Sequence, residues 1–442
     1  MLTPNSEEAR HQATDRSIGS CLRVSVLLLL ACVGCAKSEP IRFATFNASL
    51  NRDAPGKLIA DLSTPDDKQA QAVAEIIQRV RPDVILVNEF DADESGEAAR
   101  LFRTNYLQRG QNGAEPIFYP YAFSGAVNTG VASGFDLDND GVATTQPGTR
   151  AYGGDALGFG TFPGQYGMLI LSNRPILADQ VRSLRELKWK DMPGALLPVK
   201  PDGSPWYDDA ELARLPLSSK AHWDVPIVTA DRRGRVVHLL VSHPTPPAFD
   251  GPEDRNGRRN HDEIRLWADY ITGGEPARYI TGPAEAIGPR PRKPAIDTTL
   301  QGGFRGGAIA YPNWPTTFVI LGDLNADPND GASLPGAIQQ LLHHPRVNAG
   351  FVPASDGAVE AAQRQGGANA GHRSDPGHDT ADFGDTGSAP GNLRCDYVLP
   401  SRDLKIIDGG VFWPVEGDPL HRLVRGNASS DHRLVWLDVR IP

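Results

Sequence analysis

Polar side chains stand directly beyond the ends of short apolar runs at several separate points of the sequence. These residues are Asn47, Glu89, His243, Asp323, Asn325, Asp396, Asp431 and His432. Taken singly, each has an ordinary structural interpretation as a cap, a turn former or a solvated ion. Carboxylates, amides and imidazoles in such places can also bind a hard cation and transfer protons. A rigid sheet can bring the ends of its strands to one edge, so the ordered series predicts a single polar active site.

The elements that would position these side chains alternate between β and helical patterns from residue 41 onward. Apolar or β-branched runs predict strands at 41–46, 84–87, 168–171, 236–241, 318–321, 395–399 and 434–439. Helical patterns predict helices at 66–80, 97–108, 262–270 and 334–342. This alternation indicates an α/β or α+β fold and does not choose between them.

The composition is that of an acidic globular protein with many loops. The 442 residues include 44 Lys and Arg against 54 Asp and Glu, and the formal net charge is −10. This balance argues against binding nucleic acid through a broad basic surface, because Lys and Arg supply most of that affinity. The 46 glycines and 37 prolines predict long ordered loops, chiefly at 124–165, 190–220, 272–315 and 352–392.

The N-terminus has the layout of an export signal. Arg16 and Arg23 precede an apolar run that is too short to span a membrane and that is followed by small residues. Cys35 resembles the lipidated cysteine of bacterial lipoproteins, with Cys32 or plain signal cleavage as alternatives. We therefore expect residues 1–36 to be a signal peptide, with a lipoprotein type and hence a lipid anchor as one alternative. The mature protein would be periplasmic, anchored to the outer membrane or extracellular in a bacterium.

Residues 37–442 are expected to form one domain with long loop insertions, because no clean linker divides this part of the sequence. Cys395 is its single cysteine, since the other three, Cys21, Cys32 and Cys35, belong to the leader. An internal disulfide is therefore excluded, and packing must stabilise the exported domain, with bound metal as a further candidate. We expect a monomer.

The ordered motifs resemble those of the endonuclease/exonuclease/phosphatase superfamily, the DNase-I-like proteins. The sequence G-D-L-N at 322–325 resembles the family's G-D-x-N motif, and S-D-H at 430–432 resembles its terminal motif. Residues 82–89 resemble the strand that ends in the family's metal-binding glutamate, although Asn88 stands where Gln is commoner. The match spans 41–442 with insertions. It implies a four-layer α/β sandwich, in which two mixed β-sheets pack face to face and helices flank them.

The resemblance implies a hydrolase that cleaves a phosphate ester by in-line attack of water with the help of Mg²⁺ or Mn²⁺. Glu89 would bind the metal, with Asn47 beside it and Asp431 as a further ligand. Carboxylate ligands suit this chemistry, because Mg²⁺ favours one or two carboxylates together with water and substrate oxygens.

The resemblance also assigns the catalytic roles. Asp323 would orient or deprotonate the attacking water, and Asn325 would donate a hydrogen bond to the phosphate. His432 would contact the scissile phosphate or transfer a proton. Asp396 would fix the tautomer of His432 and raise its pKa, as a carboxylate partner does for a working imidazole. His243 matches the second histidine of the DNase-like branch and is the candidate for the leaving oxygen.

The substrate class stays open at this stage. A nucleic acid, a phospholipid head group and a small phosphorylated metabolite are all compatible with a fold that hosts many functions. His243 favours a nuclease or phosphodiesterase. The alternative from a different class is a non-catalytic, calcium-stabilised binding module on the same fold.

The run D-L-D-N-D-G at 136–141 matches the first half of a calcium-binding loop, with Asp136, Asp138 and Asp140 as alternate ligands. The twelfth position of such a loop would hold a bidentate Glu, and here it is Pro147. The hypothesis is therefore a structural Ca²⁺ in this insertion, against an acidic solvated turn.

Overall fold

Residues 39–229, 234–281 and 314–442 are described here from a computed structural model of the protein. The expected leader, residues 1–36, lies outside the described residues, as does the part of the 272–315 loop between 282 and 313. Within the described ranges, no helix has both the length and the hydrophobicity needed to cross a bilayer.

The first sheet has six strands in the order β12-β13-β1-β2-β4-β3. Its strands are β1 (Ile41–Asn47), β2 (Val84–Asn88), β3 (Tyr121–Phe123), β4 (Met168–Ser172), β12 (Lys405–Val411) and β13 (Val435–Arg440). β1 and β2 are parallel, and the other neighbours pair antiparallel. The sheet is therefore mixed.

The second sheet has five strands in the order β11-β8-β7-β6-β5. Its strands are β5 (Arg182–Ser183), β6 (His222–Val228), β7 (Val236–Ser242), β8 (Phe318–Asp323) and β11 (Asp396–Pro400). Only β7 and β8 pair in parallel among these neighbours. A short separate pair joins β9 (Ala381–Asp382) to β10 (Asn392–Leu393).

The apolar runs form strands that are buried on both faces. In β2, Val84 and Leu86 belong to the core between the sheets, whereas Ile85 and Val87 belong to the core outside the first sheet. Successive side chains of a strand point to opposite faces, so a continuous apolar run can pack against two layers. The same alternation in β8 separates an inner set from an outer set, namely Val319 and Leu321 from Phe318 and Ile320.

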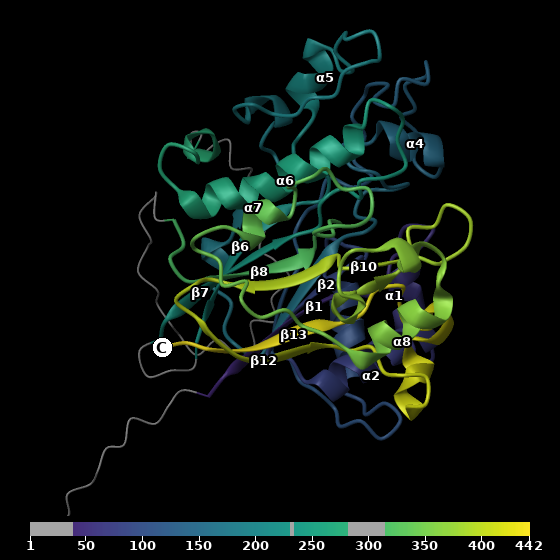
Figure 1. Cartoon of the computed structure of the whole chain (residues 1–442), viewed down its shortest axis with the longest axis vertical. Helices are drawn as coiled ribbons and strands as arrows, with labels where there is room; N and C mark the ends of the chain where they lie inside the picture. Colours follow the sequence, from purple (N-terminus) through teal and green to yellow (C-terminus); the bar gives the residue numbers. More distant parts are fainter. Residues whose placement is uncertain (1–38, 230–233, 282–313) are drawn as a thin grey trace, which may run out of the picture. The chain divides into compact units, whose positions relative to one another are not determined.

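Helices cover the outer faces of both sheets (Figure 1). α2 (Lys68–Val80) packs on the first sheet, together with α1 (Lys57–Leu62), α3 (Glu97–Leu101) and the π-helical turn Phe102–Leu107. α6 (Arg255–Thr272) and α7 (Gln339–Leu342) pack on the second sheet. The predicted four-layer α/β sandwich is thus confirmed. The remaining α-helices, in the connections, are α4 (Arg150–Asp155), α5 (Asp209–Arg214) and α8 (Asp356–Gln365).

The sequence of α2 explains both its ends and its packing. The Asp67 side chain accepts a hydrogen bond from Ala70 N and so caps the first turn. Val73, Ile77 and Val80 are buried against the sheet, at the spacing of one helical face. The helix ends at a left-handed residue, Arg81, whose φ is 55°.

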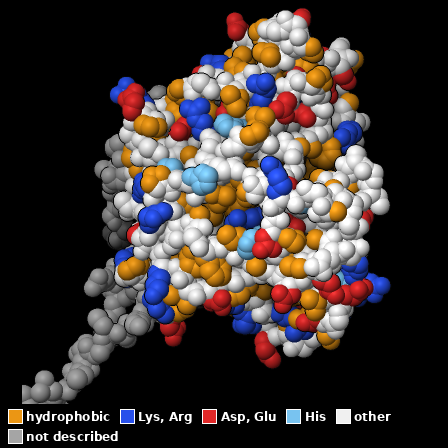
Figure 2. All heavy atoms as spheres, in the orientation of Figure 1, with side chains coloured by type: hydrophobic (Ala, Val, Ile, Leu, Met, Phe, Trp, Pro, Cys, Tyr) orange, Lys and Arg blue, Asp and Glu red, His pale blue; other side chains and the backbone are white. Residues whose placement is uncertain are grey.

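Two predicted helices have different bounds from those expected. α6 starts at Arg255 rather than at 262, and its early residues Arg259 and Asn260 are buried through polar contacts to loop carbonyls. α7 covers only Gln339–Leu342 of the predicted 334–342, because Gly336 has a φ of 88° and belongs to a turn. The surface in Figure 2 shows acidic and basic side chains interspersed over the face in view, with no broad basic area on it.

Candidate active site

The sandwich brings the ends of its central strands to one edge. In the first sheet β1 and β2 run parallel with Asn47 opposite Asn88, and Glu89 follows immediately. In the second sheet the antiparallel pairing of β11 with β8 places Asp396 opposite Asp323. The last residues of parallel strands and the first residue of an antiparallel neighbour lie at the same sheet edge. The motifs therefore converge because of strand direction and register.

The backbone turns sharply directly after these strands. Glu89 has a φ of 56° and Asn325 a φ of 53°, and Ser49 beyond β1 has a φ of 48°. Residues other than glycine seldom adopt this left-handed conformation, and it persists only where surrounding structure enforces it. Two of these residues had been selected from the sequence for their chemistry, so the strain coincides with the candidate site.

Asp323 is the point where the side chains from both sheets meet. Its Oδ2 accepts a hydrogen bond from Asn47 Nδ2 at 3.0 Å and lies 3.4 Å from His243 Nε2 and 3.6 Å from His432 Nε2. Its Oδ1 accepts from Asn325 N at 3.0 Å. Asp323 is 1% exposed, so its charge is held by these donors with little access to solvent.

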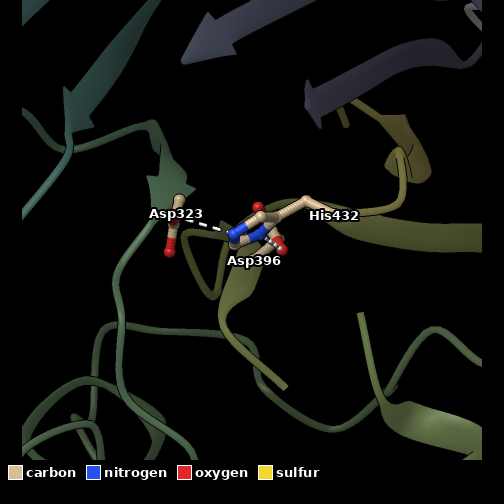
Figure 3. A group of neighbouring side chains, drawn as sticks. All are labelled: Asp323, Asp396 and His432. Atoms are coloured by element: carbon tan, nitrogen blue, oxygen red, sulfur yellow. Dashed lines mark hydrogen bonds and ion pairs between the residues drawn. The ribbon is translucent and has the colours of Figure 1, made fainter. Parts of the chain in front are cut away.

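His432 lies between two carboxylates (Figure 3). Its Nδ1 is 2.8 Å from Asp396 Oδ2, which also accepts a hydrogen bond from Thr380 Oγ1 at 2.8 Å. Thr380 Oγ1 in turn accepts from the backbone N–H groups of Cys395 and Asp396. The sequence analysis did not select Thr380, and no local motif marks it. It orients Asp396, which orients the imidazole.

The ligand atoms of Asp323, Asp396 and His432 lie within 4.8 Å of one another, a distance that would also admit a metal ion. The imidazole nitrogens nevertheless face carboxylate oxygens on both sides, with Nδ1 in a hydrogen bond to Asp396 and Nε2 in an ion-pair contact with Asp323, which suits a protonated ring. We interpret the three residues as a group for proton transfer and charge stabilisation.

The two histidines of the site have opposite pKa shifts. Burial by itself lowers the pKa of His432, but the charges of Asp396 and Asp323 and the Asp396 hydrogen bond outweigh burial and raise it. Burial lowers the pKa of His243, and the positive charge of Lys220 lowers it further. Burial alone would raise the pKa of Asp323, yet the surrounding imidazoles hold it below its usual range. Near neutral pH the site thus presents a charged His432, a neutral His243 and an ionised Asp323.

The predicted metal residues occupy the neighbouring corner. Glu89 Oε1 accepts a hydrogen bond from Asn47 Nδ2 at 3.0 Å. Ser49 links the other two, because its N–H donates to Asn47 Oδ1 and its Oγ donates to Asp431 Oδ1, both at 3.2 Å. Hard oxygen donors of this kind fit Mg²⁺ or Mn²⁺. The ligand role of Asn47 stays a prediction and requires its amide to turn, since its nitrogen now faces Glu89.

Asn325 and His243 both contact Asp323. Asn325 Nδ2 donates to Pro244 O at 3.1 Å, directly after His243. The same carbonyl oxygen lies 3.4 Å from the ammonium nitrogen of Lys220. The sequence analysis did not select Lys220, which precedes β6 and has no motif around it.

The structure groups a different set of acidic residues from the set that the calcium hypothesis predicted. The carboxylates of Asp136 and Asp138 lie within 4.8 Å of a carboxylate oxygen of Asp155, which comes from α4. Asp140 is not part of this group, and its Oδ1 accepts a hydrogen bond from Val142 N. The third acidic residue therefore comes from outside the predicted loop, a contact that the local motif did not contain.

The chain matches one protein family over most of its length. Residues 44–432 match the Endonuclease/Exonuclease/phosphatase family. The chain belongs to this family. Members of the endonuclease/exonuclease/phosphatase family are hydrolases that act on phosphoester bonds and usually use a divalent metal. The resemblance found in the sequence is thereby confirmed. The family match does not identify the substrate.

Solved structures of the endonuclease/exonuclease/phosphatase family are similar in fold at low identity. One is an endonuclease/exonuclease/phosphatase from Beutenbergia cavernae DSM 12333, with 14% identity, a TM-score of 0.44 and coverage of 91% of this chain and 72% of that chain. Another is the human nocturnin catalytic domain with bound sulfate, at 12% identity, TM-score 0.41 and coverage of 92% and 95%. A third is sphingomyelinase C from Streptomyces griseocarneus, with 14% identity, a TM-score of 0.40 and coverage of 91% of this chain and 99% of that chain. No curated protein matches the chain in sequence.

Proposed function

We propose that the protein is a Mg²⁺- or Mn²⁺-dependent phosphodiesterase or nuclease in which water attacks the phosphorus in line with the leaving oxygen. The observation that supports this most directly is the environment of Asp323. One buried, ionised carboxylate is approached by Asn47, His243 and His432, and His432 is backed by Asp396. A proton acceptor and several donors thus surround one small volume, as hydrolysis of a phosphate ester requires.

Each residue has a role that follows from its protonation state. Asp323 accepts a hydrogen bond from the attacking water and orients it, because its depressed pKa keeps it ionised. His432 holds its charge against the phosphate oxygens, where negative charge develops. Asn325 donates from its amide to the phosphate. When bound by Glu89 and Asp431, a hard divalent cation supplies further neutralisation of the phosphate oxygens.

A phosphodiester is favoured over a monoester because His243 matches the second histidine of the DNase-like branch. Negative charge develops on the leaving oxygen of the ester, where a hydrogen-bond donor stabilises it. The neutral ring of His243 carries one N–H donor and lies 3.4 Å from Asp323, so it is suited to stand near that oxygen. Nucleic acid, a phospholipid head group and a small metabolite all present such an ester. The acidic net charge favours a short or flexible substrate over tight duplex binding.

The experiment is hydrolysis of bis(p-nitrophenyl) phosphate by the purified protein in Mg²⁺ or Mn²⁺ and then in excess EDTA. We expect turnover that EDTA abolishes and that added metal restores. A panel of DNA, RNA, sphingomyelin and sugar phosphates then ranks the natural ester classes. Absence of metal-dependent turnover on every one of these esters would contradict the proposal.

The acidic group Asp136, Asp138 and Asp155 supports one second candidate, a calcium-stabilised binding module without catalysis. The intact catalytic arrangement argues against it, because a module that only binds has no need of an ionised Asp323 facing two imidazoles. The assay above separates the two functions.

We also propose that the protein is exported, on the basis of the leader sequence alone. We further propose that the mature protein acts as a monomer. Fractionation of the producing bacterium tests export, and metabolic labelling with palmitate tests a lipid anchor on Cys35. Loss of label in Cys35→Ser with label kept in Cys32→Ser would identify the anchored residue, and a cytoplasmic full-length protein would contradict export.

A further inference from the structure

Lys220 is a buried lysine without an ion-pair partner. The residue is 7% exposed, and its Nζ makes one long hydrogen bond, to Pro244 O at 3.4 Å. Among the described residues, no carboxylate oxygen lies within 4.0 Å of this nitrogen. An ammonium group can donate three hydrogen bonds, and a buried charge is costly unless it is paired. The fold therefore buries an amino group that no carboxylate of the described residues pairs.

Glu263, a nearby carboxylate, is already occupied. Its Oε1 accepts hydrogen bonds from Ser219 N and Ser219 Oγ, and its Oε2 accepts from Thr245 N. Burial lowers the pKa of Lys220, while the charges of Glu263, Glu89 and Asp323 act in the opposite direction. The influence of Glu89 and Asp323 shows that the ammonium group lies in the field of the active site.

Packing holds Lys220 in place. A Cβ atom at Gly158 would lie 1.8 Å from Ser219 O, so the glycine permits the loop to lie directly against the backbone before Lys220. From the same insertion, Asn128 N donates to Lys220 O at 2.8 Å. The lysine is thus fixed between the 124–165 insertion and the start of β6, and solvent has little access to it.

Three donors converge around the segment that follows β7. Lys220 Nζ and Asn325 Nδ2 share Pro244 O as their acceptor, and His243 is the preceding residue. A single carbonyl oxygen does not satisfy an ammonium group and an amide together. A phosphate oxygen would accept from both, and charge-assisted hydrogen bonds are the strongest available to it.

We propose that Lys220 is a phosphate-binding catalytic residue, whose ammonium group contacts a non-bridging oxygen of the substrate phosphate beside Asn325. This inference rests on the proposed function and adds a cation supplied by the protein to the one supplied by the metal. The charge acts where negative charge develops as water adds, so it stabilises the transition state more than the ground state.

Lys220→Met tests the proposal, because it removes the charge and keeps the length and apolar stem. We expect kcat/KM for bis(p-nitrophenyl) phosphate to fall about 100-fold, the effect of removing one donor to a developing oxyanion. Inhibition by inorganic phosphate should weaken in parallel. The melting temperature should stay level or rise, because a buried unpaired charge has been removed. Lys220→Arg should recover part of both losses.

Lys188→Met is the matched control, since Lys188 Nζ also donates to a backbone carbonyl, Arg214 O, at 3.0 Å. It should leave kcat/KM and phosphate inhibition unchanged. Wild-type values of both quantities in Lys220→Met would overturn the proposal. So would a loss of activity that only matches a loss of folded protein. Inactivity of the wild type on every ester would instead overturn the proposed function.

A crystal structure of the wild type with inorganic phosphate gives a test that does not depend on the variants folding. We expect a phosphate oxygen within about 3.2 Å of Lys220 Nζ, the limit of a hydrogen bond of this type. A phosphate bound by His432 but beyond hydrogen-bond reach of Lys220 would refute the assignment.

Discussion

At the residue scale, the active site depends on two imidazoles that face one carboxylate in different protonation states. Asp396 and Asp323 favour the charged form of His432, whereas burial and Lys220 favour the neutral form of His243. Titratable groups whose environments shift their pKa values apart commonly have separate acid and base roles. The difference comes from their partners, since both histidines are almost fully buried.

Replacement of His432 by alanine is expected to lower kcat by about 1,000-fold, because a central proton-transfer and charge-stabilising group is lost. Asp396→Asn should lower kcat less, since the imidazole stays but loses the charge that raises its pKa. The measurement is steady-state hydrolysis of bis(p-nitrophenyl) phosphate with Mg²⁺. His421→Ala, in the short 3-10 helix Pro419–Leu423, is the control, and near-normal turnover in His432→Ala would remove His432 from the mechanism.

The buried side chain of His222 is expected to make the stability of the fold depend on pH. Its Nδ1 is 2.7 Å from Ser218 Oγ and its Nε2 is 2.9 Å from Glu263 O. Burial lowers the pKa of His222 to about 4, against the opposing charge of Glu263. The unfolded chain binds a proton below its ordinary pKa of about 6.5 and the folded chain does not, so stability falls between about pH 6.5 and pH 4, by about 3 kcal/mol in total.

Urea unfolding of the wild type and of His222→Gln at a series of pH values measures this effect. The difference in the free energy of unfolding between the two proteins should change across that window and be constant above pH 7. A constant difference over the whole range would mean that His222 does not carry the dependence.

At the scale of elements, the strands and the residues at their ends supply the catalytic residues predicted from the sequence, and the connections supply functional residues that no local motif marks. Thr380 comes from the segment before β9, Lys220 from the loop before β6, and Asp155 from the insertion between β3 and β4. In that insertion Asp155 accepts hydrogen bonds from Leu137 N and Thr144 N and so joins distant parts of the loop. Burial raises the pKa of Asp138, and the charge of Asp155 raises it further.

Calcium should stabilise this insertion, because a bound cation would relieve the repulsion among Asp136, Asp138 and Asp155. Thermal unfolding with added CaCl₂ is expected to show a higher melting temperature, with a gain of about 2.7 kcal/mol at a calcium concentration of 100 times Kd. Asp138→Asn should reduce the gain, and Asp140→Asn serves as the control. Equal gains in both variants, or no gain in the wild type, would support an acidic solvated turn.

At the scale of the whole molecule, charge limits how the substrate can be held. The net charge is −10, and acidic and basic groups are interspersed on the face shown in Figure 2. A protein that neutralises many phosphates shows a steep fall in affinity with salt, in proportion to the number of phosphates contacted. At the site itself, Lys220 and His432 are two basic side chains that can contact phosphate.

A short single-stranded oligonucleotide should therefore bind with a weak salt dependence. The slope of log K against log salt is expected to be about −0.7 to −1.4, corresponding to one or two neutralised phosphates on a single strand. Fluorescence anisotropy with the wild type in excess EDTA, where no turnover is expected, measures the slope without cleavage. A slope steeper than about −5 would indicate an extended basic surface and contradict this prediction.

The fold could be predicted from the sequence where the signals are local. The apolar runs became strands such as β2 and β8 because the period of side-chain burial is contained within a few residues. β6 was missed because Pro226 interrupts its pattern; the strand tolerates Pro226 because its carbonyl oxygen makes the contact on that edge, accepting a hydrogen bond from Leu177 N. β12 was missed because only its last residue, Val411, is buried and because it includes Lys405 and Asp408, so it has no apolar run.

By itself, the sequence determined the fold family and the identities of the residues that converge, since these are written in strand periods and in short motifs at strand ends. Tertiary structure alone decided the contacts that set their chemistry. Thr380 reaches Asp396, Lys220 stays unpaired beside Asn325, and Asp155 replaces Asp140 beside Asp136. Burial and charge at a side chain depend on which distant segments pack around it, and no local pattern encodes those distances.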